Sequence, residues 1–145
     1  MRQALYAAKI LAYAQGFALL QNAFVAYGWP MDLEKIAGVF RAGRIILGAF
    51  LDDIMAAYRK NPTLAHLTHA LFFAQKLAQY QLALRAATMS AIESSVPANA
   101  FTSAVVYYDA LRGAPMGENL LRAQRDYFGA HTYRRTDREG IFHHA

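Results

Sequence analysis

Apolar residues recur at spacings of three and four along most of the chain, and no stretch alternates apolar and polar positions as a half-buried strand does. The clearest amphipathic segment is the one whose apolar stripe comprises Leu47, Phe50, Leu51, Ile54, Met55 and Tyr58. Its charged residues lie off that stripe. The pattern predicts an all-α, bundle-like domain of about six or seven helices.

Capping and breaking residues set the limits expected for these helices. Asp32 is a good N-cap for a second helix that ends by Gly43, and Pro62 ends the third helix and can begin the next. We expect a long helix over 64–93, whose apolar stripe is Leu67, Leu71, Ala74, Ala78 and Leu82. Two more helices are expected over 101–111 and 117–129. The chain then becomes polar and aperiodic, which divides it into a helical domain, 1–129, and a C-terminal tail, 130–145.

The segment 10–31 contains no charged residue and is long enough to span a bilayer. However, Gln15, Gln21 and Asn22 would be costly at the bilayer centre, and Pro30 breaks the segment. We therefore expect a helix buried on nearly all sides, at the centre of a bundle or inside an oligomer, and no membrane partner. No small-residue cleavage site follows a short apolar run, so we expect no signal peptide and a cytoplasmic location.

Composition narrows the class of protein. Hydrophobic residues make up 56% of the chain and charged residues 17%, the reverse of the balance in disordered chains. The absence of cysteine excludes disulfide scaffolds, iron–sulfur sites and thiol nucleophiles. A net charge of +5 favours anionic partners, but it is too mild an excess to indicate nucleic acid.

The common catalytic motifs are absent from the sequence. It contains no G-x-G-x-x-G, no P-loop and no G-x-S-x-G elbow. His66 and His69 can share a helix face, but they lack a nearby carboxylate or third ligand, so we expect no metal site. Asp52 and Asp53 are adjacent, and their side chains should diverge on a solvated helix face rather than form a carboxylate pair.

Basic residues gather in the C-terminal third of the chain, namely Arg112, Arg122, Arg125, Arg134, Arg135 and Arg138. Arginine can hold a phosphate or carboxylate bidentately, and histidine adds a directional donor. Arg125 on the last helix and His131 just past its end could converge on one anionic group. The ordinary alternative is a solvated basic face.

The string from Asn119 to Tyr133, NLLRAQRDYFGAHTY, closely resembles the C-terminal signature of the decarboxylating 6-phosphogluconate dehydrogenases. The resemblance extends in order over essentially the whole chain. Its other segments are Ala4–Ile10, Tyr13–Phe17, Ile36–Ala37, Phe40–Gly43, Phe50–Leu51, Asn61–Pro62, Ala104, Tyr107–Asp109, Arg112 and Gly140–His143. The chain departs from the family pattern over Gly43–Leu47 and at Arg122, where the family commonly has glutamine, and it stops at Ala145, about where the family has a tryptophan.

The resemblance implies a function for only part of such an enzyme. The family oxidises 6-phosphogluconate with NADP and decarboxylates it to ribulose 5-phosphate, CO2 and NADPH in the pentose phosphate pathway. This chain is similar to the later part of the helical domain plus the tail. The Rossmann domain and the catalytic lysine and glutamate lie upstream of the matched segment, and Lys9 does not match that lysine. The resemblance implies no cofactor bound by this chain alone.

Two residues carry over from the family to this sequence. The arginine and histidine of the signature bind substrate in the neighbouring subunit's active site, and here they are Arg125 and His131. We expect a homodimer whose core this chain supplies and which is inactive by itself. A candidate partner is an upstream half that contains the Rossmann domain. The alternative is a free-standing helical interaction or scaffold protein that reuses this half-domain without enzymatic activity.

Overall fold

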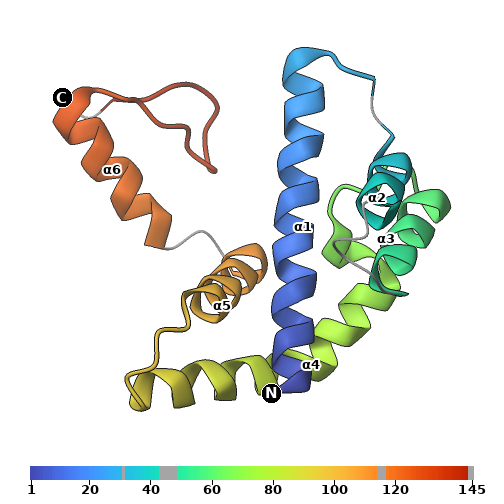
Figure 1. Ribbon diagram of the computed structural model, residues 1–145. Helices are drawn as coiled ribbons and strands as arrows, with labels where there is room; N and C mark the ends of the chain where they lie inside the picture. Colours follow the sequence, from blue (N-terminus) through green and yellow to red (C-terminus); the bar gives the residue numbers. More distant parts are fainter. Residues whose placement is uncertain (31, 43–48, 114–116, 144–145) are drawn as a thin grey trace. The chain divides into compact units, whose positions relative to one another are not determined.

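The computed structural model describes residues 1–30, 32–42, 49–113 and 117–143. Within these residues the chain is all-α, as predicted, and the only β-bridge pairs Tyr133 with Phe142. Figure 1 shows the helices α1 (Arg2–Tyr27), α2 (Leu33–Ala42), α3 (Ala49–Lys60), α4 (Leu71–Glu93), α5 (Asn99–Arg112) and α6 (Gly117–Gly129) and the 3-10 turn η1 (Leu67–His69). The chain divides into two compact units, residues 1–107 and 108–145. The division expected at Gly129 stays a prediction.

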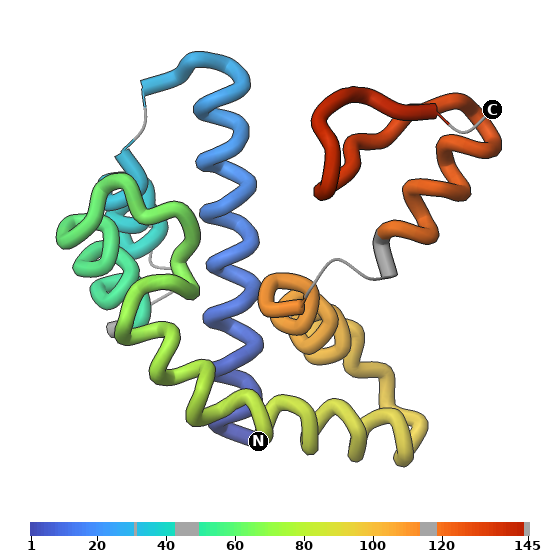
Figure 2. The backbone as a smooth tube through the Cα atoms, turned by 180° about the vertical axis from the view of Figure 1, so that it is seen from behind, coloured from blue at the N-terminus to red at the C-terminus, as the bar shows by residue number. Residues whose placement is uncertain are grey.

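Helix α1 runs along the length of the first unit. Helix α4 packs against α1 and crosses it near the N-terminal end of α1 (Figure 2). The buried residues of α1 follow helical spacing and are mostly small: Ala4, Ala7, Ala8, Ile10, Leu11, Ala14 and Phe17. The alanines allow the two helix backbones to approach closely. The C-terminal half of α1 is more open, with Leu19 70% exposed and Val25 79% exposed. Within the described residues, α1 is therefore buried along one stripe and not, as the sequence had predicted, on nearly all sides.

Polar residues inside α1 are accommodated within the fold. The Gln21 side-chain amide donates to the carbonyl oxygen of Leu64 at 3.1 Å. Gly28 ends the helix in the left-handed conformation, at φ 65°, a value that suits a residue without a side chain. Across the described residues, no helix is long and apolar enough to cross a membrane.

Helices α2 and α3 lie side by side as a helical hairpin (Figure 1). Asp32 caps α2 as predicted, since its Oδ1 accepts the Lys35 backbone N–H at 3.0 Å. The predicted α3 stripe is confirmed for the buried residues Phe50, Leu51, Ile54 and Tyr58. Leu47 and the segment 43–48 lie outside the described residues.

Aromatic rings fill the space between α1 and the hairpin. The Phe50 ring meets Tyr6, Tyr13 and Phe73 edge-on, at centroid distances of 5.7, 5.1 and 5.8 Å. Burial raises the pKa of Tyr58 to about 12, so its hydroxyl stays neutral at physiological pH. These contacts hold α3 on the buried side of α1.

The long fourth helix differs from its prediction at both its start and its face. Helix α4 begins at Leu71, after a separate 3-10 turn and an extended residue, Ala70. Its buried residues are Phe73, Leu77, Leu84 and Thr88, whereas Leu71 and Leu82 of the predicted stripe are 68% and 70% exposed. The predicted face was wrong because α4 carries apolar residues on two sides and has few charges to mark the exposed one.

The second unit contains α6 and the tail that follows it. Helix α6 opens at Gly117 and closes at Gly129, as predicted. The tail turns back on itself, because Tyr133 and Phe142 exchange two backbone hydrogen bonds of 2.9 Å. A loop over 134–141 is thereby closed beside the end of α6.

Candidate functional site

The last turn of α6 and the start of the tail place His131 beside the helix end. The Ala130 N–H donates to the Asp126 carbonyl oxygen at 2.7 Å, which closes the helix. A Cβ placed on Gly129 would lie 3.1 Å from Nε2 of His131, so the imidazole rests against the bare backbone of that glycine. A side chain at position 129 would push the ring away.

Arg125 and His131 line one cavity of about 360 Å³ in the second unit. The other lining residues are Arg122, Thr132, Tyr133, Arg134 and Ile141. The structure thus brings together the two residues predicted from the sequence, with two further arginines. Among the described residues that line the cavity none is acidic, so its electrostatic potential favours an anion.

Arg125 is exposed, and within the described part of the chain no ion pair holds its guanidinium. Two acids of the same helix, Asp126 and Glu118, are close enough in sequence to Arg125 to be considered as its partners. Asp126 instead turns inward, and the side chain of Glu118 lies outside the described residues. The Arg125 fork therefore has the freedom to bind an external anion.

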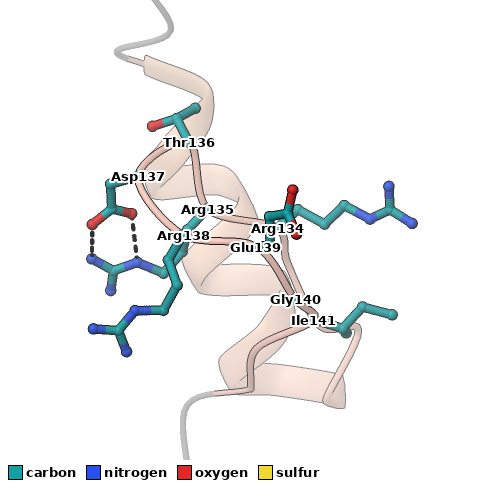
Figure 3. Close-up of a pocket in the computed structure, with 8 residues that line it drawn as sticks. All are labelled: Arg134, Arg135, Thr136, Asp137, Arg138, Glu139, Gly140 and Ile141. Carbon is teal, nitrogen blue, oxygen red and sulfur yellow. Dashed lines mark hydrogen bonds and ion pairs between the residues drawn. The ribbon is translucent and has the colours of Figure 1, made fainter.

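Arg134 also lines a neighbouring cavity of about 580 Å³, together with Arg135 and Arg138 of the loop 134–141 (Figure 3). Arg135 donates to both carboxylate oxygens of Asp137, at 2.8 and 2.7 Å, and its guanidinium also lies over the Phe142 ring. This ion pair lowers the pKa of Asp137 and raises that of Arg135. Arg135 therefore stabilises the conformation of the loop. The Arg134 side chain extends to the other side of the loop from Arg135, and Arg138 extends on the same side as Arg135 (Figure 3).

The histidines of the first unit have a structural setting. His66 is buried; its Nδ1 lies 2.7 Å from the Thr68 hydroxyl and its Nε2 lies 2.9 Å from the Tyr107 hydroxyl. Burial, and then the neighbouring His69, lowers the pKa of His66. In the described residues no group of three His, Asp or Glu side chains is placed to hold a metal ion.

The adjacent carboxylates of α3 diverge. Asp52 pairs with Arg41 at 3.0 Å, and burial raises the pKa of Asp53, as does the nearby Asp52. The ion pair between Asp52 and Arg41 joins α3 to α2, so this carboxylate serves the hairpin.

The described residues do not form the usual cradle for a nicotinamide dinucleotide. Such a cofactor sits on a glycine-rich turn between a strand and a helix. The described residues provide helices and one isolated bridge, and the printed sequence has no matching glycine motif. The basic cavity fits a small anionic group, because three arginine side chains, Arg122, Arg125 and Arg134, line it.

The family model for the C-terminal domain of 6-phosphogluconate dehydrogenase matches residues 1–145. The chain belongs to this family. The resemblance drawn from the signature string is therefore confirmed over the length of the chain.

Several curated members of the 6-phosphogluconate dehydrogenase family are close in sequence. The decarboxylating enzyme of Escherichia coli (strain K12) is 48% identical over 143 residues, which is 99% of this chain and 31% of that enzyme. Two Bacillus subtilis (strain 168) enzymes, one NADP(+)-dependent and one NAD(+)-dependent, are 48% and 47% identical. The chain spans about a third of the length of the curated relatives it matches.

A solved structure of the Plasmodium falciparum 6-phosphogluconate dehydrogenase matches the fold. The TM-score is 0.88 at 39% identity, covering 98% of this chain and 30% of that one. That enzyme is described in its apo form, with its cofactor NADP+ and with its substrate 6-phosphogluconate.

One residue of the site was missed from the sequence. Asp126, inside the signature string, is fully buried and accepts two hydrogen bonds from the tail. It was not among the site residues predicted from the sequence, which were Arg125 and His131. No periodic pattern marked this residue, because its partners Thr132 and His143 lie in the tail and not on the helix.

Proposed function

We propose that this chain is the C-terminal portion of an NADP-dependent decarboxylating 6-phosphogluconate dehydrogenase. In this role it supplies the core of a homodimer and a substrate-binding arm. The observation that carries the proposal is the convergence of Arg125 and His131 on one basic cavity, in a chain that belongs to this family. Decarboxylation and hydride transfer are assigned to groups outside this chain.

In this proposal the arm binds the phosphate of 6-phosphogluconate in the neighbouring subunit's active site. The Arg125 guanidinium holds two phosphate oxygens at once and stays charged at any physiological pH. His131 donates one further hydrogen bond from its ring. Both contacts position the substrate, and neither residue moves a proton to or from the reacting carbon.

Cofactor selection belongs to the part of the enzyme that carries a dinucleotide site. The NADP(+)-dependent and NAD(+)-dependent relatives from one Bacillus subtilis strain match this chain almost equally, at 48% and 47% identity. The near-equal identities support the proposal that this segment does not contact the nucleotide, because it occurs in both NADP(+)-dependent and NAD(+)-dependent enzymes. We propose NADP for the complete enzyme and no cofactor for the chain alone, with the pentose phosphate pathway and the cytoplasm as its setting.

A complementation assay tests this function. The chain alone is expected to produce no NADPH from NADP and 6-phosphogluconate, because it has no dinucleotide cradle. A fusion that joins the upstream part of the Escherichia coli enzyme to residue 1 of this chain should restore turnover. A folded fusion without activity would contradict the proposal and favour the scaffold alternative, and so would turnover by the pure chain.

A further inference from the structure

The tail loop is anchored at its base by one buried carboxylate. Oδ1 of Asp126 accepts the backbone N–H of Thr132 at 2.7 Å, in the tail segment that leaves α6. The same oxygen lies 3.0 Å from Nδ1 of His143, in the tail segment that returns toward α6. Because an ionised carboxylate can only accept, His143 carries its hydrogen on Nδ1 and donates it. One side chain of α6 therefore contacts both the outgoing and the returning segment of the loop.

These bonds sit directly next to the backbone bridge that closes the loop. Thr132 precedes Tyr133 and His143 follows Phe142, the two residues that exchange backbone hydrogen bonds. The Asp126 side chain is 0% exposed, so solvent does not weaken its contacts. Burying a carboxylate is costly unless donors compensate it, which makes the geometry around Asp126 narrowly defined.

The same contacts determine where His131 lies. His131 is flanked by Ala130 at φ 50° and Thr132 at φ 61°, two non-glycine residues in the left-handed region. Such conformations persist where surrounding contacts enforce them. The bond from Thr132 to Asp126 supplies that constraint one residue after His131, and the imidazole then rests against Gly129 on the wall of the cavity.

We propose that Asp126 is a positioning residue for the anion site, which fixes the His131 ring in the cavity that it shares with Arg125. The proposal rests on the proposed function, since it assumes that Arg125 and His131 bind the substrate's phosphate. Asp126 itself lines no part of that cavity and acts through the Thr132 backbone and His143.

Nuclear magnetic resonance on the full 145-residue chain tests the proposal. In the unmodified chain we expect nuclear Overhauser contacts between the His131 ring and the Gly129 α-protons, and slow exchange of the Thr132 amide proton. Asp126→Asn keeps the shape and an acceptor but removes the charge, and should speed Thr132 exchange about tenfold. Asp126→Ala should abolish the ring contact and weaken 6-phosphogluconate binding by roughly tenfold or more, through misplacement of His131.

Asp137 offers a matched control, because it is an exposed carboxylate of the same loop that pairs with Arg135. Asp137→Asn should leave the His131 contact, Thr132 exchange and ligand affinity unchanged. The amide signals of α6 check that each variant keeps its helix. Retention of the His131–Gly129 contact and of full affinity in both Asp126 variants would overturn the proposal.

A third variant separates this proposal from the function on which it rests. Arg125→Ala should weaken 6-phosphogluconate binding while leaving the His131–Gly129 contact intact. If Arg125→Ala leaves the affinity unchanged, the proposed phosphate role of Arg125 fails, while the ring contact in the Asp126 variants still decides what Asp126 does.

Discussion

His66 links the turn η1 to helix α5 through a single ring. Its Nδ1 caps η1 by accepting from Thr68, and its Nε2 reaches the Tyr107 hydroxyl on α5. The ring stays neutral in this setting because burial, and then His69, lowers its pKa. Protonation of Nδ1 would remove the acceptor that caps the turn.

This shift predicts a stability that depends on pH. Above pH 6.5 both folded and unfolded forms hold a neutral His66, and the full stability is present. As the pH falls below 6.5 the unfolded chain takes up the proton first, so the free energy of unfolding decreases until the lower folded pKa is reached. Thermal unfolding between pH 7.5 and pH 5, both about one unit or more from 6.5, should show this decline.

The matched variants are His66→Asn and His69→Gln. His66→Asn keeps a capping oxygen but does not titrate, so it should flatten part of the decline in Tm. His69→Gln should keep most of it, because burial is the larger cause of the shift. Equal pH profiles for the unmodified chain and His66→Asn would contradict the assignment.

The site residues illustrate what a sequence can reveal at this scale. Arg125 and His131 were found because their residue types, in that string, match a known signature. The contacts of Asp126 could not be found from the sequence, because they involve Thr132 and His143 and hence depend on how the tail folds back. A contact across seventeen positions leaves no periodic trace in the sequence.

Helix α4 shows the limit of periodicity at the scale of one element. The stripe of α3 was predicted well because charged residues mark its exposed side. In α4, leucines occupy both sides, and the choice between them is made by Phe73 packing against Phe50 and by contact with α1. The start of α4 was also hidden, since the His66-capped turn interrupts a continuous apolar pattern.

Two leucines of α4 provide a direct test of its buried face. Leu84 is 1% exposed and Leu82 is 70% exposed. Leu84→Ala should lower the free energy of unfolding by about 2–5 kcal/mol, because it leaves a cavity at a buried position. Leu82→Ala should change it by about 0.5 kcal/mol or less. Chemical denaturation of both variants measures the difference, and equal losses would show that the face is misassigned.

At the scale of the whole molecule, the apolar surface exceeds what one copy covers. Large side chains stay exposed along α1, among them Leu5, Leu19 and Val25, although most of that helix carries no charge. Extended apolar patches on proteins usually mark interfaces. We therefore expect a second copy to cover exposed apolar residues of α1.

We predict that the chain self-associates at micromolar concentration. Light scattering should give a mass of at least two copies, and the double variant Leu19→Gln, Val25→Gln should shift the population toward monomer. Circular dichroism confirms that the variant keeps its helices. A monomeric unmodified chain would contradict the dimer-core role.

The most direct test of the central claim is the kinetics of Arg125→Ala in the active fusion with the upstream part of the Escherichia coli enzyme. Charge-assisted contacts are worth roughly 1.5–3 kcal/mol, so the KM for 6-phosphogluconate should rise about ten- to a hundredfold. The kcat should fall much less, since the contact is made equally in the ground and transition states. Arg138→Ala, a tail arginine that does not line the Arg125–His131 cavity, serves as the matched control and should leave KM unchanged. A large loss of Tm in Arg125→Ala with an unchanged KM would contradict the account, because Arg125 would then only hold α6 in place.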